Sequence, residues 1–128
     1  YMSGSTQSLG YHYFFEFYDC PTHKLSMVEP VRKAMVEAAE KSGASIVNDV
    51  FHQFNPQGVS GVVVIKESHL SIHTWPEHGY AAVDFFTCSL NTHPKKAMQH
   101  LANELCSARS EMKFFERGTF QHLCNKSA

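Results

Sequence analysis

Hydrophobic positions along the first third of the chain change from the pattern of a strand to that of a helix. Residues 11–18 (YHYFFEFY) are dense in aromatic side chains, which is typical of a β-strand. Ser26 and Glu29 resemble a capping box at the start of a helix that ends near Ser42, and Gly43 suits the left-handed position after it. Between these ends, apolar residues recur at the i, i+4, i+7 and i+8 spacing of one helix face: Val31, Met35, Ala38 and Ala39.

After Gly43 the hydrophobic pattern changes to that of β-strands. Turn-forming residues at Asn55–Gly58 and Pro76–Gly79 divide this region, which predicts a mostly antiparallel meander. Pro94 opens a second helical pattern at a position where proline is tolerated, and residues 113–120 predict a last strand. Four short segments rich in Val, Ile and Phe form the predicted meander: 44–54, 59–66, 68–75 and 81–88.

The predicted order of elements is β-α-β-β-β-β-α-β. It indicates an α+β fold, a two-layer sandwich with two helices on one face of a mostly antiparallel sheet, in a single domain of residues 1–128. Valine or isoleucine occupies every position of 62–65, so this strand carries apolar side chains on both faces. We therefore expect both faces of the sheet to be buried, as in a homodimer whose sheets pack face to face. The alternative is a loosely covered face with a few exposed valines.

Composition narrows the class of protein. The chain has 128 residues, of which 43% are hydrophobic, as in a soluble globular domain. Its longest apolar run, Val62–Ile65, is far shorter than the ~20 residues of a membrane helix, and we expect no signal peptide. The net charge of −1 gives no basis for binding nucleic acid. Four cysteines without a CxxC pair are expected to be free thiols in a cytoplasmic protein: Cys20, Cys88, Cys106 and Cys124.

The segment 58–77 concentrates serines, histidines and a carboxylate, and a metal site is the first possibility. On a helix, His69 and His73 would share a face and could both bind zinc. Polar and apolar residues alternate here instead, which predicts a strand and separates the two histidines by ~13 Å. We therefore expect no metal.

A serine-hydrolase triad is the second possibility. The segment Gly58–Gly61 lacks the G-x-S-x-G spacing of a nucleophile elbow. A serine of this region, Ser60 or Ser68, could still act with His73. Asp84 would then complete a triad, and the residues alone leave this alternative open.

Residues 58–88 resemble the signature of the prokaryotic S-adenosylmethionine decarboxylases. The resemblance rests on four short motifs: Glu67–Leu70, Ile72–Glu77, Gly79–Ala82 and Phe86–Cys88. Further similar positions lie outside this region, so that the resemblance covers nearly the whole chain: Leu9-Gly10-x-His12, Ser42–Ala44, Phe51-His52-x-Phe54 and Arg117-Gly118. The small size is similar to that of the short bacterial and archaeal form of this family.

The resemblance implies a chain that cuts itself between Glu67 and Ser68, into fragments 1–67 and 68–128. Ser68 then becomes a pyruvoyl group, the electron sink that removal of CO₂ from an amino acid requires. The substrate amine is expected to form a Schiff base with this group.

Three further residues take roles in this chemistry by the same resemblance. His73 is expected to remove the α-proton of Ser68 during cleavage, and Ser60 to hydrogen-bond the tetrahedral intermediate. Cys88 is expected to deliver a proton to the substrate, and an ordinary thiol with a pKa of ~8.5 carries that proton at neutral pH. A strand is compatible with a local arrangement of these groups.

The implied substrate is S-adenosylmethionine, whose decarboxylated form is the aminopropyl donor for spermidine and other polyamines. Phe54 resembles a residue that stacks on the adenine, and Glu77 one that binds the ribose hydroxyls. The alternative is arginine or ornithine, since similar pyruvoyl scaffolds decarboxylate those amino acids. A non-enzymatic paralogue is a further alternative, although the residues of the cleavage apparatus are retained.

One departure from the family pattern is Lys66, where a small polar residue is usual. A cation that pointed into the site would disfavour a sulfonium substrate, and we expect Lys66 to face solvent. Four neighbouring residues are expected to pack or to support the site: His69, Ser71, Trp75 and Tyr80.

Overall fold

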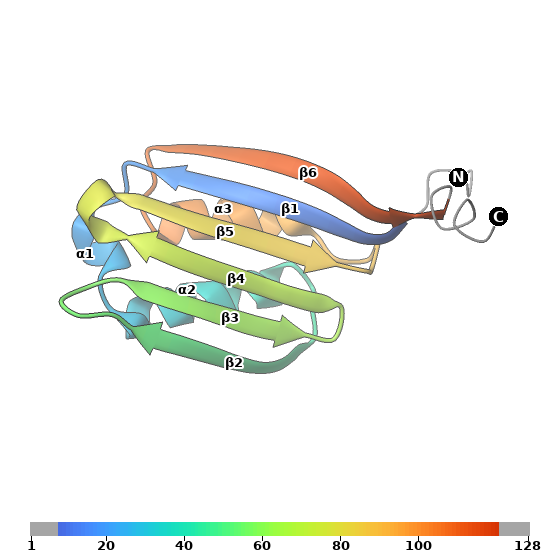
Figure 1. Ribbon diagram of the computed structural model, residues 1–128, viewed down its shortest axis with the longest axis horizontal. Helices are drawn as coiled ribbons and strands as arrows, with labels where there is room; N and C mark the ends of the chain where they lie inside the picture. Colours follow the sequence, from blue (N-terminus) through green and yellow to red (C-terminus); the bar gives the residue numbers. More distant parts are fainter. Residues whose placement is uncertain (1–7, 121–128) are drawn as a thin grey trace.

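A computed structural model of the protein describes residues 8–120. Its elements, in chain order, are β1 (Ser8–Tyr18), α1 (Thr22–Leu25), α2 (Val28–Lys41), β2 (Ile46–Gln53), β3 (Val59–Ile65), β4 (Ser68–Trp75), the 3₁₀ turn η2 (Pro76–His78), β5 (Tyr80–Thr87), α3 (Pro94–Glu104) and β6 (Arg109–Thr119). The strands form one six-stranded sheet in the order β2-β3-β4-β5-β1-β6, and each neighbouring pair is antiparallel. The helices α2 and α3 lie together behind one face of this sheet (Figure 1).

The core lies between the sheet and these two helices. Alternate strand residues such as Phe15, Leu70 and Phe85 are completely buried on this side. Met35 of α2 and Leu101 of α3 meet them with no exposed surface. Because strand side chains alternate between faces, burying one parity leaves the other on the opposite face of the sheet. The predicted α+β sandwich with helices on one face is therefore confirmed.

The helix ends follow some of the local sequence signals and not others. Gly43 adopts the left-handed conformation expected after a helix, with φ of 83°, and Pro94 is the first residue of α3. The predicted capping box is wrong, because α2 begins at Val28 without a side-chain cap. The hydroxyl of Ser26 donates instead to the carbonyl of Thr22, 2.7 Å away, at the end of the short helix α1. That extra turn of helix had no counterpart among the predicted elements.

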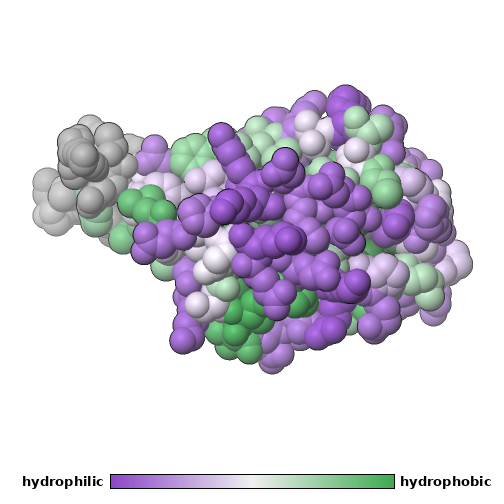
Figure 2. Space-filling view, turned by 180° about the vertical axis from the view of Figure 1, so that it is seen from behind, coloured by the Kyte–Doolittle hydropathy of each residue, from purple (hydrophilic) through white to green (hydrophobic). Residues whose placement is uncertain are grey.

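The two faces of the molecule differ in polarity. Figure 2 shows the helix-covered side, which is mostly hydrophilic. The opposite face of the sheet, here called the open face, exposes large apolar side chains, with Val50 at 64%, Val64 at 39% and Phe115 at 61% exposure. Apolar side chains spread over one sheet face are typical of an interaction surface. The homodimer stays a prediction.

Two expectations from composition meet the structure directly. Within residues 8–120, no helix has the length and apolar character needed to cross a membrane. Cys20, Cys88 and Cys106 are free thiols, as expected, and Cys124 lies outside the described residues.

Candidate active site

The Glu67–Ser68 bond lies in the tight turn that joins β3 to β4. Ser68 has a φ of 151°, a backbone conformation that L-residues rarely adopt. Its partner across the ladder is Thr87, so Cys88 comes next to the turn. The backbone N–H of Cys88 donates to the carbonyl oxygen of Glu67 at 2.9 Å. The carbonyl that Ser68 is expected to attack thus already accepts a hydrogen bond from the main chain.

The same turn is held from its other side by Ser45. The backbone N–H of Ser45 donates to Glu67 Oε1 at 3.1 Å, and its carbonyl accepts from the N–H of Lys66 at 2.8 Å. The side chain of Lys66 is exposed, which agrees with the expected solvent-facing direction. Both the main chain and the side chain of Glu67 are therefore anchored.

Ser60 and His73 lie together at the opposite end of the strands. They are direct partners in the β3–β4 ladder. The ring of His73 lies 4.2 Å from that of Trp75 and 5.7 Å from that of Phe54, measured between centroids. Phe54 is 39% exposed and thus has a free surface for a ligand.

Glu77 projects from the η2 turn at this same end and is exposed. Gly79 closes the turn with a left-handed φ of 61°. A side chain at Gly79 would come within 2.9 Å of the carbonyl oxygen of Cys20, so the close approach of these segments requires glycine. The turn that carries Glu77 is fixed against the end of β1 in this way.

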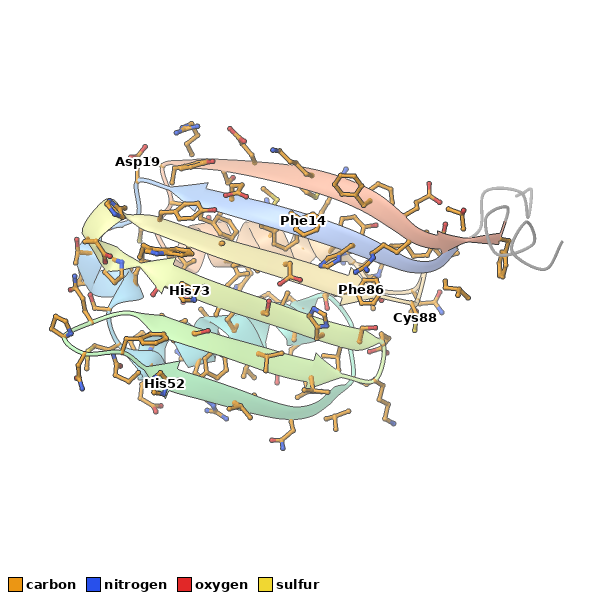
Figure 3. The ribbon with its side chains drawn as sticks, in the orientation of Figure 1. Phe14, Asp19, His52, His73, Phe86 and Cys88 are labelled. Atoms are coloured by element: carbon orange, nitrogen blue, oxygen red, sulfur yellow. The ribbon has the colours of Figure 1, made fainter. Side chains whose placement is uncertain are left out.

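The predicted site residues therefore form two groups. We call Glu67, Ser68 and Cys88 the cleavage end, and Phe54, Ser60, His73 and Glu77 the histidine end. His73 follows Ser68 by five positions on one strand, which separates them by ~16 Å. Figure 3 shows His73 and Cys88 toward opposite ends of the sheet. Within one chain the structure therefore does not bring Ser68 and His73 together.

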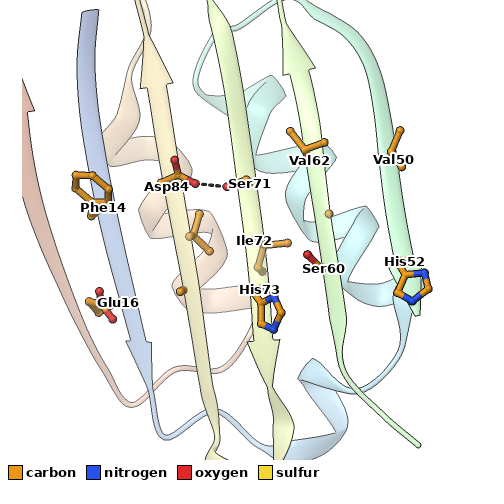
Figure 4. A pocket seen from close by; sticks show the side chains of 13 residues that line it. Phe14, Glu16, Val50, His52, Ser60, Val62, Ser71, Ile72, His73 and Asp84 are labelled. Carbon is orange, nitrogen blue, oxygen red and sulfur yellow. Dashed lines mark hydrogen bonds between the residues drawn. The ribbon is translucent and has the colours of Figure 1, made fainter. Parts of the chain in front are cut away.

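An open hollow of about 660 Å³ lies on the open face between the two ends (Figure 4). It borders the histidine end and reaches across the sheet to β1. Its polar lining comes from His52, Glu16, Ser60, Ser71, His73 and Asp84.

Asp84 is the centre of a hydrogen-bonded cluster on this face. Its Oδ2 lies 2.6 Å from His12 Nε2 and 3.2 Å from His69 Nε2, and the Ser71 hydroxyl donates to its Oδ1. Burial raises the pKa of the Asp84 carboxyl, but the hydrogen bonds from its donors outweigh burial and lower that pKa to about 2. The carboxylate is therefore ionised at neutral pH.

This cluster bears on two sequence-based interpretations. Among the described residues Asp84 hydrogen-bonds His12 and His69 and not His73, so the geometry does not support the serine-hydrolase triad. His69 and Ser71 both hydrogen-bond Asp84, and their supporting role stays a prediction. The hydrogen bond between His12 and Asp84 was not predicted from the sequence. The only signal was the place of His12 in the Leu9-Gly10-x-His12 motif.

The remaining supporting residues lie between β4, β5 and β1. The ring of Trp75 lies 5.3 Å from that of Tyr80, and the Tyr80 hydroxyl donates to Glu16. Burial and the Glu16 carboxylate together raise the pKa of Tyr80 well above its usual range. Tyr80 therefore stays protonated and joins the histidine end to β1.

Comparison with known proteins decides the family. The family model described as S-adenosylmethionine decarboxylase matches residues 11–118. The chain belongs to the S-adenosylmethionine decarboxylase family. The match spans β1 to β6 and includes both ends of the site.

Relatives in this decarboxylase family agree with that assignment over about nine-tenths of their length. The chain is 52% identical over 117 residues to the S-adenosylmethionine decarboxylase proenzyme of Thermosipho melanesiensis, covering 91% of this chain and 90% of the relative. It is 50% identical to the protein of the same name from Thermotoga maritima, with the same coverage. The crystal structure of the adenosylmethionine decarboxylase from Aquifex aeolicus is similar, with a TM-score of 0.81 and 34% identity over 88% of this chain and 93% of that one.

Proposed function

We propose that this protein is an S-adenosylmethionine decarboxylase that cuts itself between Glu67 and Ser68 and converts Ser68 into its pyruvoyl cofactor. Membership of the family supports the activity. The observation that carries the self-cleavage is local: Ser68 holds a strained φ of 151° next to a carbonyl that accepts the Cys88 N–H at 2.9 Å. Backbone strain next to a preorganised hydrogen-bond donor favours cleavage of the adjacent peptide bond.

Cleavage begins with attack of Ser68 Oγ on the carbonyl carbon of Glu67. Negative charge develops on the Glu67 oxygen, where the Cys88 N–H already points and stabilises it. The Glu67–Ser68 C–N bond then breaks, the nitrogen gains the hydroxyl proton, and an ester joins the two residues. Removal of the α-proton of residue 68 expels the Glu67 carboxylate and leaves dehydroalanine. Tautomerisation and attack of one water release ammonia and leave the pyruvoyl group.

His73 and Ser60 are proposed to assist these steps from a second copy of the chain. Within one chain they lie ~16 Å from Ser68, which is beyond the reach of hydrogen bonding or proton transfer. A twofold axis that crosses the strands midway would place the histidine end of one protomer over the cleavage end of its partner. The exposed apolar side chains of the open face, among them Val50 and Val64, favour such sheet-on-sheet packing. Each dimer would then contain two composite sites.

In the processed enzyme the pyruvoyl group supplies the electron sink for loss of CO₂. The residues of the cleavage end fit its formation, because residue 68 would become the first residue of the second fragment. The Cys88 thiol lies one residue beyond Thr87, the ladder partner of residue 68, and is exposed at the sheet end. We propose that Cys88 Sγ delivers the proton that replaces CO₂ on the substrate α-carbon.

The histidine end is suited to an adenosyl group. The partly exposed ring of Phe54 can stack on a purine, and the exposed Glu77 carboxylate can accept hydrogen bonds from two ribose hydroxyls. Arginine and ornithine lack both groups, and the relatives described above are named for S-adenosylmethionine. The product would then be the aminopropyl donor for spermidine synthesis.

The test has two parts. Purified protein should give two fragments of 67 and 61 residues by intact mass, since cleavage after Glu67 divides 128 residues in this way, and Ser68→Ala should stay intact. Release of labelled CO₂ should then be measured in parallel from S-adenosylmethionine, arginine and ornithine. An uncut wild-type chain after long incubation would refute the cofactor, and turnover of an amino acid alone would refute the substrate.

A further inference from the structure

Asp84, in the middle of the open face, hydrogen-bonds the residue next to Ser68. Its Oδ2 accepts from His69 Nε2 at 3.2 Å, and His69 is bonded directly to Ser68. His12 holds the same oxygen from β1 at 2.6 Å. The carboxylate thus ties three neighbouring strands, β1, β4 and β5, and reaches the cleavage turn through His69.

The tautomer of His12 follows from its second contact. Arg117 Nη1 lies 3.3 Å from His12 Nδ1, and a guanidinium can only donate. His12 Nδ1 therefore accepts, and its proton is on Nε2, which donates to Asp84. The chain Arg117–His12–Asp84 is consistent in every donor and acceptor, so it fixes the carboxylate in one orientation for His69.

A metal site is the competing interpretation of this cluster. The donor atoms of His12, His69 and Asp84 lie within 4.8 Å of one another, a set of ligands that divalent metals accept. These atoms already satisfy one another directly, and the Arg117 guanidinium faces His12 where a metal site ordinarily has a carboxylate or carbonyl. The arrangement is better suited to orient a side chain than to hold a second cation.

The strained backbone of Ser68 needs anchors on both sides of the scissile bond. On the upstream side, Glu67 is held through its carbonyl by the Cys88 N–H and through its side chain by the Ser45 N–H. On the downstream side, the His69 side chain is fixed by Asp84. If the φ of Ser68 relaxed toward ordinary values, either Glu67 or His69 would have to move away from its hydrogen-bond partners.

We propose that Asp84 and His69 form a positioning pair for self-cleavage, which holds Ser68 in the conformation from which its hydroxyl attacks Glu67. This inference rests on the proposed function and extends it to residues that touch no substrate. The pair acts on the first step, the attack that forms the ester. It takes no part in the later removal of the α-proton, which is assigned to His73.

The experiment compares cleavage of freshly translated wild type, His69→Ala, His69→Gln and Asp84→Asn, followed by the appearance of the two fragments. His69→Ala should slow cleavage about tenfold or more, since a misplaced reacting group loses rates of this order. His69→Gln keeps an N–H donor for Asp84 and should recover most of the rate. Asp84→Asn removes the charge from the other member of the pair and should also cleave slowly. Sedimentation and thermal melting of each variant show whether it folds and assembles.

A matched control uses the same chemistry in the other layer. Glu37 on α2 holds His100 Nε2 on α3 at 3.0 Å, and neither residue belongs to the hydrogen bonds described for the cleavage turn. Glu37→Gln weakens a carboxylate–histidine pair of the same type and should leave the cleavage rate unchanged.

Hydroxylamine identifies the step that is affected, because it cleaves esters and not amides. His73→Ala should accumulate the ester and be cut by hydroxylamine, whereas uncut His69→Ala should resist it. The proposal is wrong if His69→Ala cleaves at the wild-type rate, if His69→Gln is as slow as His69→Ala, or if hydroxylamine cuts His69→Ala as readily as His73→Ala. A wild-type chain that never cleaves would instead overturn the proposed function.

Discussion

Cys88 contacts Glu67 through its main chain and leaves its side chain exposed. The backbone N–H donates to the Glu67 carbonyl oxygen at 2.9 Å, while the side chain is exposed at the end of the sheet. In the proposed mechanism the N–H stabilises charge during cleavage, and the exposed thiol acts on the substrate later. One residue can therefore serve both reactions through different atoms.

Substitutions at Cys88 should separate these two roles. Cys88→Ala keeps the N–H and should yield both fragments at close to the wild-type rate, with CO₂ release reduced about a hundredfold because the proton donor is gone. Cys88→Pro removes the N–H as well and should slow cleavage itself. Intact mass and CO₂ release measure the two effects, and melting curves check that Cys88→Pro folds. Full turnover by Cys88→Ala would contradict the role of the thiol.

Much of the fold was accessible from the sequence because local patterns dominate it. The alternation in β4 and the helical spacing in α2 placed these elements to within a few residues. The predicted capping box failed for a local reason. The Ser26 hydroxyl donates to the Thr22 carbonyl, an interaction that competes with a capping box and depends on the short helix α1.

The site was less accessible, because it depends on register and on distance along a strand. The motif residues Ser68 and His73 belong to one strand, and their spacing excludes direct contact. The His12–Asp84 bond joins residues 72 positions apart in sequence, and only the pairing of β1 with β5 brings them together. A motif identifies such residues without showing which of them meet.

Acid should weaken the fold partly through Asp84. Because hydrogen bonds lower its folded-state pKa from 3.8 to about 2, the carboxylate stabilises the protein above its unfolded pKa, near 4. This contribution, on the order of 2 kcal/mol, is lost progressively as the pH falls from near 4 through 2.

The measurement is urea unfolding between pH 5 and pH 2, in a Ser68→Ala background that keeps every chain uncut. The difference in unfolding free energy between Asp84 and Asp84→Asn proteins should shrink as the pH falls. A difference that stays constant over this range would show that ionisation of Asp84 adds no stability.

Substrate affinity should depend on the histidine end without a matching change in cleavage. Phe54→Leu removes the aromatic face and Glu77→Gln removes the charge that accepts ribose hydroxyls, so each should raise KM for S-adenosylmethionine about tenfold or more. Both chains should still process to two fragments. Lys66→Ala serves as the control, since its exposed side chain should leave KM unchanged. Equal KM values for all these proteins would place the adenosyl group elsewhere.

Two inactive chains should restore cleavage when they share a dimer. Ser68→Ala keeps His73 but lacks the nucleophile, and His73→Ala keeps the nucleophile but lacks the base. In a mixed dimer one composite site combines the intact Ser68 of one protomer with the intact His73 of the other. Only the His73→Ala chain should then be cut, and random pairing of equal amounts gives a limit of about half of those chains.

Differently tagged chains, expressed together and separately, provide the measurement. Each variant alone should stay uncut, because every site in its own dimers lacks one of the two groups. If the groups act within one chain, co-expression changes nothing, which the ~16 Å between them on β4 makes difficult to reconcile with proton transfer. Cleavage of the His73→Ala chain in mixed dimers alone would assign Ser68 and His73 of one site to different protomers.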